Sequence, residues 1–455
     1  MNSRSLATPQ ARSKPAWKNL SVLFTVLICL AAPAAAARAA EPPPAVWLPA
    51  RIAALSQLYK ELHQSPELSF AEIKTAARMA AELRRLDFQV TEQVGGHGVV
   101  GVLANGTGPT LMLRADMDGL PVLEETGLDY ASRVTVADDR GAVVGVMHAC
   151  GHDMHMACLV GTLDYLAAHR SGWQGTVVAI FQPAEEKGGG AQAMLEAGLL
   201  RKFPRPDFAL ALHVAADRAA GRVATRPGYA MANVDSVEIT IHGRGGHGAY
   251  PHMTVDPIVI AARLVMDLQT IVSREVKPIE PAVVTVGSIH GGTKSNVIGD
   301  QCKLQLTVRS FTPEVRTQLL AAIKRKALAA AASSGAPEPT VVASQEGTPS
   351  LYNDPALVER VRPALVRAVG EDHVDVSDPS MGGEDFGRFG RAGVPIVMVS
   401  VGSVSAERLA RYRAEGGEPS LHSPRYYPDV EATLTTGVSA LASMAVELLP
   451  PAAAK

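Results

Sequence analysis

The sequence predicts an α/β protein into which a second, separately folded unit is inserted. Apolar strands alternate with helices before residue 230 and again after residue 345, which is typical of a sheet covered by helices on both faces. Between these stretches the order becomes strand, helix, strand, strand, helix, strand, which is the ferredoxin-like βαββαβ arrangement. A chain of 455 residues is also too long for one comfortable hydrophobic core. We therefore expect a leader at 1–40, a main domain formed by 41–229 and 346–455, and an inserted domain at 230–345.

The leader is predicted to be a secretory signal peptide. Basic residues precede the apolar run from Leu20 to Ala32, and Ala37-Arg38-Ala39 offers a small-x-small cleavage signal. The alternative is an uncleaved membrane anchor, but the run is shorter than the roughly 20 residues that a spanning helix needs, and Pro33 interrupts it. We expect cleavage near Ala39 or Ala40, giving a secreted or periplasmic protein without a stable membrane anchor.

Net charge and cysteine content bear on two properties, nucleic-acid binding and disulfide formation. The formal net charge is -2, so no excess of basic residues favours binding to nucleic acid. Removal of the leader leaves Cys150, Cys158 and Cys302, and an odd number rules out a complete disulfide framework. Metal coordination would protect a thiol in an oxidising compartment, because it holds the sulfur as a bound thiolate.

The first segment of the main domain is predicted to begin with two helices. Apolar residues recur at three- and four-residue spacing from Ile52 to Leu62, and a second helix should run from Glu72 to Leu86. Two apolar runs flank the Gly-containing turn 105–108, which predicts a hairpin. A helix is then expected at 156–168, a strand at 176–181, a helix at 191–197, and a strand at 208–212 that ends at His213.

The inserted unit has clear helix starts. Asp256 precedes Pro257 and Thr312 precedes Pro313, so each polar side chain can cap a helix that begins with proline. Its strands are expected at 236–242, 282–289, 302–310 and 339–343, and its helices at 257–273 and 313–332. The second segment of the main domain should add a helix at 355–369, a strand at 395–401 and a helix at 431–449.

The stretch from Met147 to His155 is predicted to be half of a metal site. Cys150 and His152 are separated only by Gly151, which allows the tight turn that brings a thiolate and an imidazole onto one ion. The alternative for an isolated C-x-H is a buried cysteine beside ordinary surface histidines. Later motifs favour the metal site.

Glu185, Glu186, His213 and His422 supply those later motifs. Two adjacent carboxylates after a buried strand are tolerable if a cation takes one while the other stays free to accept a proton. Taken singly, the glutamate pair could be a solvated loop and each histidine could be structural. Together with the Cys150 turn they form a thiolate, imidazole and carboxylate set that suits zinc, manganese, cobalt or nickel, with enough ligands for two ions.

Five motifs occur along the chain in the order Arg114–Pro121, His148–Asp153, Pro183–Glu186, Gly243–His247 and Gly383–Phe386. Together they resemble the M20 family of metallopeptidases, in the amidohydrolase branch that includes hippurate hydrolases, N-acyl amino acid hydrolases and auxin-conjugate hydrolases. The resemblance covers nearly the whole chain after the leader, and it implies a dinuclear-metal exopeptidase-like catalytic domain with an inserted lid and dimerisation domain.

The resemblance also implies a division of labour in the site. Glu185 would be the general base that deprotonates a water bridging two divalent transition metal ions, manganese or zinc, with cobalt and nickel as alternatives. Either Asp118 or Asp153 would orient a ligand imidazole. The implied metal ligands are Cys150, His152, Glu186, His213 and His422.

The inserted domain carries three further residues that the resemblance singles out. His247 would reach the active site of the other subunit of a homodimer, with His252 as a second imidazole nearby that the motif favours less. Asn296 and Arg309 would hold the carboxylate of the substrate; a turn asparagine and a strand-end arginine on a solvated face are equally acceptable readings. The connections near 226–228 and 345–347 would act as a hinge between the two domains.

We therefore expect a metal-dependent amidohydrolase that cleaves N-acyl or N-aroyl amino acids to a carboxylate and a free amino acid. A carboxypeptidase or dipeptidase on the same scaffold is the first alternative. A non-catalytic periplasmic metal-binding or peptide-binding protein is a more remote one, because such a protein has no use for a base such as Glu185 beside its ligands.

Overall fold

A computed structural model describes residues 41–451 except 138–140, 345–346 and 418–419. The predicted signal peptide at 1–40 and two residues of the predicted hinge, Gln345 and Glu346, lie outside the described residues. Among the helices that are described, none has the length and hydrophobicity that crossing a membrane requires.

The main domain is built on an eight-stranded mixed sheet in the order β1-β2-β6-β3-β7-β18-β8-β17. Strands β6, β3, β7 and β18 run parallel to one another at its centre, and all but one residue of β3, of β6 and of β18 are buried. The strands are β1 (Gln89–Thr91), β2 (Val99–Asn105), β3 (Thr110–Asp116), β6 (Gly175–Gln182), β7 (Phe208–Ala219), β8 (Val223–Thr225), β17 (Val374–Val376) and β18 (Ile396–Val404).

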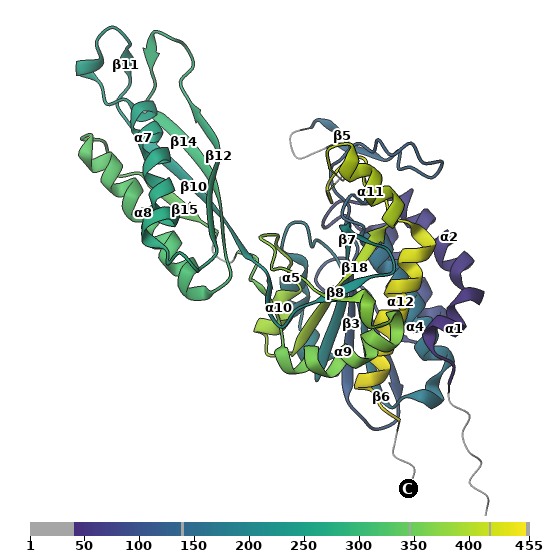
Figure 1. Ribbon diagram of the computed structural model, residues 1–455. Coiled ribbons are helices and arrows are strands. Elements are labelled where there is room, and N and C mark those ends of the chain that lie inside the picture. Colours follow the sequence, from purple (N-terminus) through teal and green to yellow (C-terminus); the bar gives the residue numbers. More distant parts are fainter. Residues whose placement is uncertain (1–40, 138–140, 345–346, 418–419, 452–455) are drawn as a thin grey trace, which may run out of the picture. The chain divides into compact units, whose positions relative to one another are not determined.

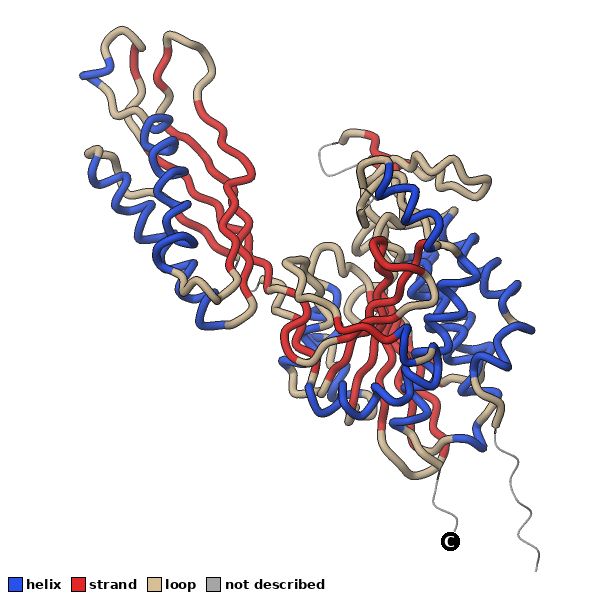
Figure 2. The backbone as a smooth tube through the Cα atoms, viewed as in Figure 1, coloured by secondary structure: helices blue, strands red, loops and turns tan. Residues whose placement is uncertain are grey.

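Helices cover both faces of this sheet, as Figures 1 and 2 show. Leu111 and Leu113 of β3 pack into the core under α2, α3, α4, α9 and α12, whereas Met112 between them packs into a separate core with α5, α6 and α10. The predicted α/β class is confirmed. The helices are α1 (Pro44–Trp47), α2 (Ile52–His63), α3 (Ile73–Arg85), α4 (His152–Ala168), α5 (Gly190–Glu196), α6 (Leu199–Lys202), α9 (Pro355–Val369), α10 (Gly387–Arg391), α11 (Ala406–Ala414) and α12 (Val430–Leu448).

The predicted hairpin around residues 105–108 is wrong. Strand β6 lies between β2 and β3, antiparallel to the first and parallel to the second. The reason is burial: from Val177 to Gln182 every residue of β6 is buried, so this strand takes an interior place and displaces the direct β2 to β3 pairing. A turn between two apolar runs shows that they are close in sequence, but does not show that they pair.

The prediction that His213 ends a strand is also wrong. Strand β7 continues through His213 to Ala219, because β18 pairs with it in parallel from Ile396 to Val404 and extends the ladder beyond the histidine. His213 therefore projects from the middle of a long paired strand, which is a more rigid support than a strand end.

The inserted segment forms a second sheet in the order β12-β14-β10-β15, with all neighbours antiparallel. One face of this sheet packs on α7 and α8 around its own hydrophobic core, in agreement with the predicted βαββαβ order. The boundaries 230 and 345 and the lid role stay predictions. The elements are β10 (Asn233–His242), α7 (Pro257–Thr270), β12 (Ala282–Gly291), β14 (Gln301–Ser310), α8 (Pro313–Ser333) and β15 (Thr340–Ala343).

The predicted caps of the inserted helices are confirmed. The Asp256 side chain accepts hydrogen bonds from the backbone of Ile258 and Val259, and Thr312 accepts one from Val315. The helix expected at 257–273 is α-helical only to Thr270, and a π-helical turn, Ile271–Glu275, follows it.

Short paired strands complete the structure. Strands β9 (Gly228–Met231) and β16 (Leu351–Asn353) pair antiparallel, so the two connections between the main and inserted segments run side by side. The other pairs are β4 (Thr135–Ala137) with β5 (Val143–Gly145), and β11 (Gly246–His247) with β13 (Val297–Ile298). Single 3-10 turns lie at Leu48–Ala50, Arg170–Gly172, Pro251–Met253 and Glu371–His373.

Candidate metal centre

The Cys150 turn has the geometry that its sequence predicts. Gly151 has a φ of 81°, in the left-handed region, and a Cβ built on it would lie 2.6 Å from the Val214 side chain. Glycine is therefore required twice over, by its backbone conformation and by the lack of space. Because α4 begins at His152, four residues earlier than predicted, this histidine is fixed in the first turn of a buried helix.

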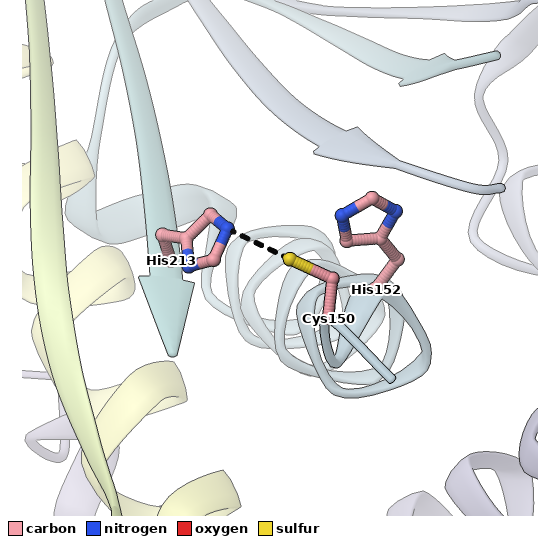
Figure 3. Close-up of side chains that lie close together, drawn as sticks. All are labelled: Cys150, His152 and His213. Atoms are coloured by element: carbon pink, nitrogen blue, oxygen red, sulfur yellow. Dashed lines mark hydrogen bonds between the residues drawn. The ribbon is translucent and has the colours of Figure 1, made fainter. Parts of the chain in front are cut away.

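Cys150, His152 and His213 place one donor atom each within 4.8 Å of one another. Figure 3 shows the three side chains converging, with the Cys150 thiol directed at His213; Sγ lies 3.6 Å from Nε2. The Nδ1 of His213 donates to the Val214 carbonyl at 2.8 Å, so the proton is on Nδ1 and Nε2 presents its lone pair. His213 thus faces the cluster in the form that a metal ligand needs.

A second triplet consists of Cys150, Glu186 and His422 and shares the thiol with the first. His422 has a φ of 68°, unusual for a residue with a side chain, and its N–H donates to the Ala149 carbonyl at 2.9 Å. Its Nε2 lies 3.4 Å from Oε1 of Glu186. All five predicted ligands are therefore brought together, and Cys150 is placed to contact both halves of the cluster.

Glu185 lies beside this cluster and belongs to neither of these two triplets, but its carboxylate also lies within 4.8 Å of donor atoms of His152 and Glu186. One of its carboxylate oxygens is 4.0 Å from Nε2 of His152, and the side chain is largely buried. Burial first, and then the negative charges of Glu384 and Asp385, raise the pKa of Glu185 well above its usual 4.5. A carboxylate in this environment is a stronger base than one in water.

The buried polar atoms of the cluster fit a cation. Within the described part of the chain, Nε2 of His152 and Oε1 of Glu186 are buried without a hydrogen-bond partner, whereas Nδ1 of His152 lies 3.3 Å from Asp118. Such orphaned groups are costly unless something else satisfies them. Burial also raises the pKa of the Cys150 thiol well above 9.0, so a thiolate here needs a nearby positive charge.

The structure distinguishes the two candidate orienting aspartates. Oδ1 of Asp118 lies 3.3 Å from Nδ1 of His152, whereas Oδ2 of Asp153 lies 2.6 Å from Nδ1 of His63, away from the cluster. Asp118 is also buried and accepts a 2.6 Å hydrogen bond from the Ser69 hydroxyl. Asp118 is therefore the aspartate that is placed to orient His152.

His155, the third histidine of the stretch, does not offer a free nitrogen. The Val214 N–H donates to its Nε2 at 2.9 Å, so the proton is on Nδ1 and is donated to Asp116 at 2.7 Å. Burial lowers the pKa of His155 to about 4, which keeps the ring neutral. His155 is accordingly a structural residue that ties α4 to β3 and β7.

A buried ionic network lies beneath the site and was not predicted from the sequence. The guanidinium of Arg114 lies 2.7 Å from Asp116, 2.8 Å from Glu384 and 3.2 Å from Asp385, and Nε donates to Gln182 at 3.1 Å. Arg114 is 1% exposed. The available signal was an arginine inside an otherwise apolar strand, since buried charges are paired.

The predicted residues of the inserted segment are split between two places. Arg309 lines a cleft of about 590 Å³ together with Cys150, Glu185 and His213, and its Nη1 donates to the Met381 carbonyl at 2.9 Å. His247 and Asn296 are not among the described residues that line this cleft. The two residues lie on neighbouring segments instead, because the N–H of Gly248, next to His247, donates to the Asn296 carbonyl at 2.9 Å.

Comparison with known proteins now identifies the family. Residues 112–447, which include all of the candidate ligands, match peptidase family M20/M25/M40. The chain belongs to this family. The resemblance inferred from the five motifs is thereby confirmed.

Individual relatives match most of this M20 chain. It is 37% identical over 339 residues to thermostable carboxypeptidase 2 of Saccharolobus solfataricus, covering 73% of this chain and 82% of the relative. It is 39% identical over 335 residues to N-acetyl-L-cysteine deacetylase of Bacillus subtilis, covering 72% and 76%. The solved structure of Bacillus subtilis YXEP, described as a dinuclear metal binding peptidase, superposes with a TM-score of 0.70 at 31% identity and covers 88% of this chain and 99% of its own.

Proposed function

We propose that this M20 chain is a two-metal amidohydrolase that cleaves the amide bond of N-acyl or N-aroyl amino acids. The products would be a carboxylate and a free amino acid. The observation that carries the proposal is the buried carboxylate of Glu185, which lies 4.0 Å from His152 and beside the two triplets that contain the five proposed ligands. Metal storage or transport has no use for a base in that place. The B. subtilis relative named as an N-acetyl-L-cysteine deacetylase supports the same reaction class.

The five converging side chains would hold two divalent cations. His152 and His213 would lie on one side, Glu186 and His422 on the other, and Cys150 between them. Thiolate, imidazole and carboxylate together suit borderline transition metals, so we propose manganese or zinc, with cobalt and nickel as alternatives. When bound, such cations lower the pKa of the attacking water and stabilise negative charge on the carbonyl oxygen.

Glu185 would carry the proton through the reaction. Its carboxylate, 4.0 Å from His152, would accept a proton from the attacking water and then deliver it to the nitrogen of the leaving amine. The His152 ring would be held in place meanwhile by Asp118.

Residues of the inserted segment would bind the far end of the substrate. Arg309 lines the same cleft as Glu185, and a guanidinium suits an amino acid carboxylate. We propose that Asn296 also binds this carboxylate and that His247 acts across a homodimer. In support of this, His247 is exposed, and its Nδ1 accepts a hydrogen bond from Ala249, which leaves a proton on Nε2 for donation to a substrate carbonyl.

A carboxypeptidase or dipeptidase is the second candidate, favoured by the similarity to thermostable carboxypeptidase 2. The test is release of free amino acid from a panel of N-acetyl, N-benzoyl and dipeptide substrates. It is run with the protein as isolated, after chelation, and after each metal is added back. We expect the highest kcat/KM on an N-acyl amino acid and none after chelation. The highest value on a dipeptide would favour the second candidate, and full activity without metal would overturn both.

We also propose that the protein works outside the cytoplasm, as its N-terminal sequence predicts. The test is N-terminal sequencing of the protein from whole-cell fractions. A mature N-terminus near Glu41 in the exported fraction would support the proposal, and an intact Met1 in the cytoplasmic fraction would contradict it.

A further inference from the structure

Three consecutive backbone N–H groups, those of Ala184, Glu185 and Glu186, are all bound by buried carboxylates. Ala184 donates to Glu72 at 2.7 Å, and Glu185 and Glu186 each donate to Asp118 at 3.1 Å. The segment that carries the proposed base is therefore fixed through its backbone and not only through its side chains. Asp118 also faces His152, but Glu72 contacts no candidate ligand.

Glu72 comes from a distant part of the sequence, immediately before α3. Its side chain is fully buried, and the same oxygen, Oε1, accepts hydrogen bonds from Ala184 and, at 3.0 Å, from Phe70. Both donors are non-glycine residues in the left-handed region, with φ of 50° for Ala184 and 65° for Phe70. A residue with a side chain holds that conformation only where its surroundings enforce it. One carboxylate oxygen thus restrains two strained residues.

The conformation of Ala184 decides where Glu185 points. Ala184 follows Pro183 at the end of β6, and its left-handed backbone reverses the chain so that Glu185 and Glu186 enter the cluster. The carbonyl of Ala184 accepts from the N–H groups of Gly189 and Gly190 at 3.2 and 3.1 Å, which closes the loop. If Ala184 relaxed to the right-handed region, the peptide before Glu185 would rotate and carry the base away from its position.

We infer that Glu72 is a positioning residue for the proposed general base: by accepting from the Ala184 N–H it holds the left-handed turn that aims Glu185. The inference rests on the proposed function for the role of Glu185, but the backbone restraint stands without it. The second oxygen of Glu72, Oε2, is buried without a partner in the described part of the chain. Burial, with a contribution from Asp118, also raises the pKa of Glu72 to about 7. The contact that this role requires is the hydrogen bond accepted by Oε1 from Ala184.

This hydrogen bond sets the choice of variants. Glu72→Gln keeps an oxygen that can accept from Ala184 and Phe70, whereas Glu72→Leu keeps the buried volume and removes the acceptor. Glu72→Leu should lower kcat by roughly 10 to 100-fold with little change in KM or metal content, since small misplacement of a catalytic group has effects of that size. Glu72→Gln should stay within about threefold of the wild type, because the acceptor is retained.

Glu67 provides a matched control from the same segment. Its carboxylate accepts from the N–H groups of Lys74 and Thr75 and from the Thr75 hydroxyl, so it supports the same helix α3 without touching residues 184–186. Glu67→Ala should therefore lower the Tm and leave kcat unchanged. A loss of kcat in Glu67→Ala equal to that in Glu72→Leu would mean that any damage to this segment has the same effect, and would overturn the inference.

Amide hydrogen exchange tests the restraint independently of activity. Peptides covering residues 182–190 should exchange faster in Glu72→Leu than in the wild type and at wild-type rates in Glu72→Gln. If Glu72→Leu does not fold, Glu72→Asp withdraws the acceptor by one methylene and should show the same two effects more weakly. Wild-type kcat and exchange in the folded variant that lacks the acceptor would overturn the inference. A wild-type protein inactive on every amide would contradict the proposed function alone, because the exchange result would still decide the restraint.

Discussion

The carboxylate of Asp118 faces the imidazole of His152, with Oδ1 3.3 Å from Nδ1. A carboxylate in this position fixes the orientation of a ligand ring and increases its basicity. We therefore predict that Asp118→Asn weakens metal binding about 10 to 100-fold. The measurement is metal content per chain after dialysis against a series of buffered metal concentrations.

Asp153→Asn is the matched control for Asp118→Asn. Asp153 is equally buried and follows His152 directly in sequence, but its carboxylate faces His63. We expect it to lose stability and keep its metal affinity. Reduced metal affinity in Asp153→Asn, with wild-type affinity in Asp118→Asn, would show that the contact seen in the structure is not the one that orients His152.

Glu185 and Glu186 are neighbours with different predicted roles. Glu185→Gln should retain both metals and lose roughly 10² to 10⁴-fold in kcat, because the amide cannot accept a proton. Glu186→Gln should lose metal as well as activity, since Oε1 of Glu186 lies between His152 and His422 at 3.8 and 3.4 Å. Metal analysis and kcat, measured on the same samples, separate the two. The reverse pattern of metal loss would exchange the assignments.

His63 should make the stability of the fold depend on pH. It is buried between Asp153, 2.6 Å from Nδ1, and Glu124, 3.1 Å from Nε2. Burial alone would lower the pKa of His63, but the hydrogen bonds to the two carboxylates outweigh it and raise the pKa from 6.5 to about 9. The folded state therefore binds the proton more tightly than the unfolded chain does. The resulting stabilisation is complete below pH 6.5 and is lost as the pH rises through about 9.

The comparison that isolates this effect is His63→Gln against the wild type. The shift corresponds to on the order of 3 kcal/mol of unfolding free energy at acid to neutral pH. Urea unfolding should show a large difference between the two proteins near pH 6 and a much smaller one near pH 10. A difference that stays constant over this range would mean that packing of the ring, and not its charge, is what His63 contributes.

The turn that carries Cys150 and His152 could be predicted from the sequence because its geometry is local. Gly151 has a left-handed backbone that only glycine adopts freely, so the turn between Cys150 and His152 follows from three residues. The helix caps at Asp256 and Thr312 are local in the same sense. Each was predicted correctly for that reason.

The pairing of strands that are distant in sequence was harder to predict from the sequence. The insertion of β6 between β2 and β3 depends on which strand buries both faces, and the extension of β7 past His213 depends on the length of β18, nearly two hundred residues away in sequence. The contacts of Arg114 with Glu384, and of Glu72 with Ala184, also join segments whose proximity no local pattern encodes. Such contacts are fixed only when the sheet order is known.

The last prediction concerns the homodimer. His247 is exposed on β11, and Nε2 carries the proton because Nδ1 accepts from Ala249 at 3.0 Å. His247 is not among the described residues that line the cleft of its own chain. If it serves the other subunit, each active site combines Glu185 of one chain with His247 of the other. Glu185→Gln and His247→Ala should then both be inactive alone and regain activity when mixed, because a heterodimer contains one site with both residues intact. Random exchange of equal amounts would give about a quarter of the wild-type activity, since half of the dimers are mixed and each of these has one intact site of two.

His252→Ala is the control, because its imidazole is exposed five residues from His247 and should be dispensable. Subunit exchange is verified by mass spectrometry of differently tagged chains. An absence of rescue in verified heterodimers would place His247 in the site of its own subunit or outside the reaction.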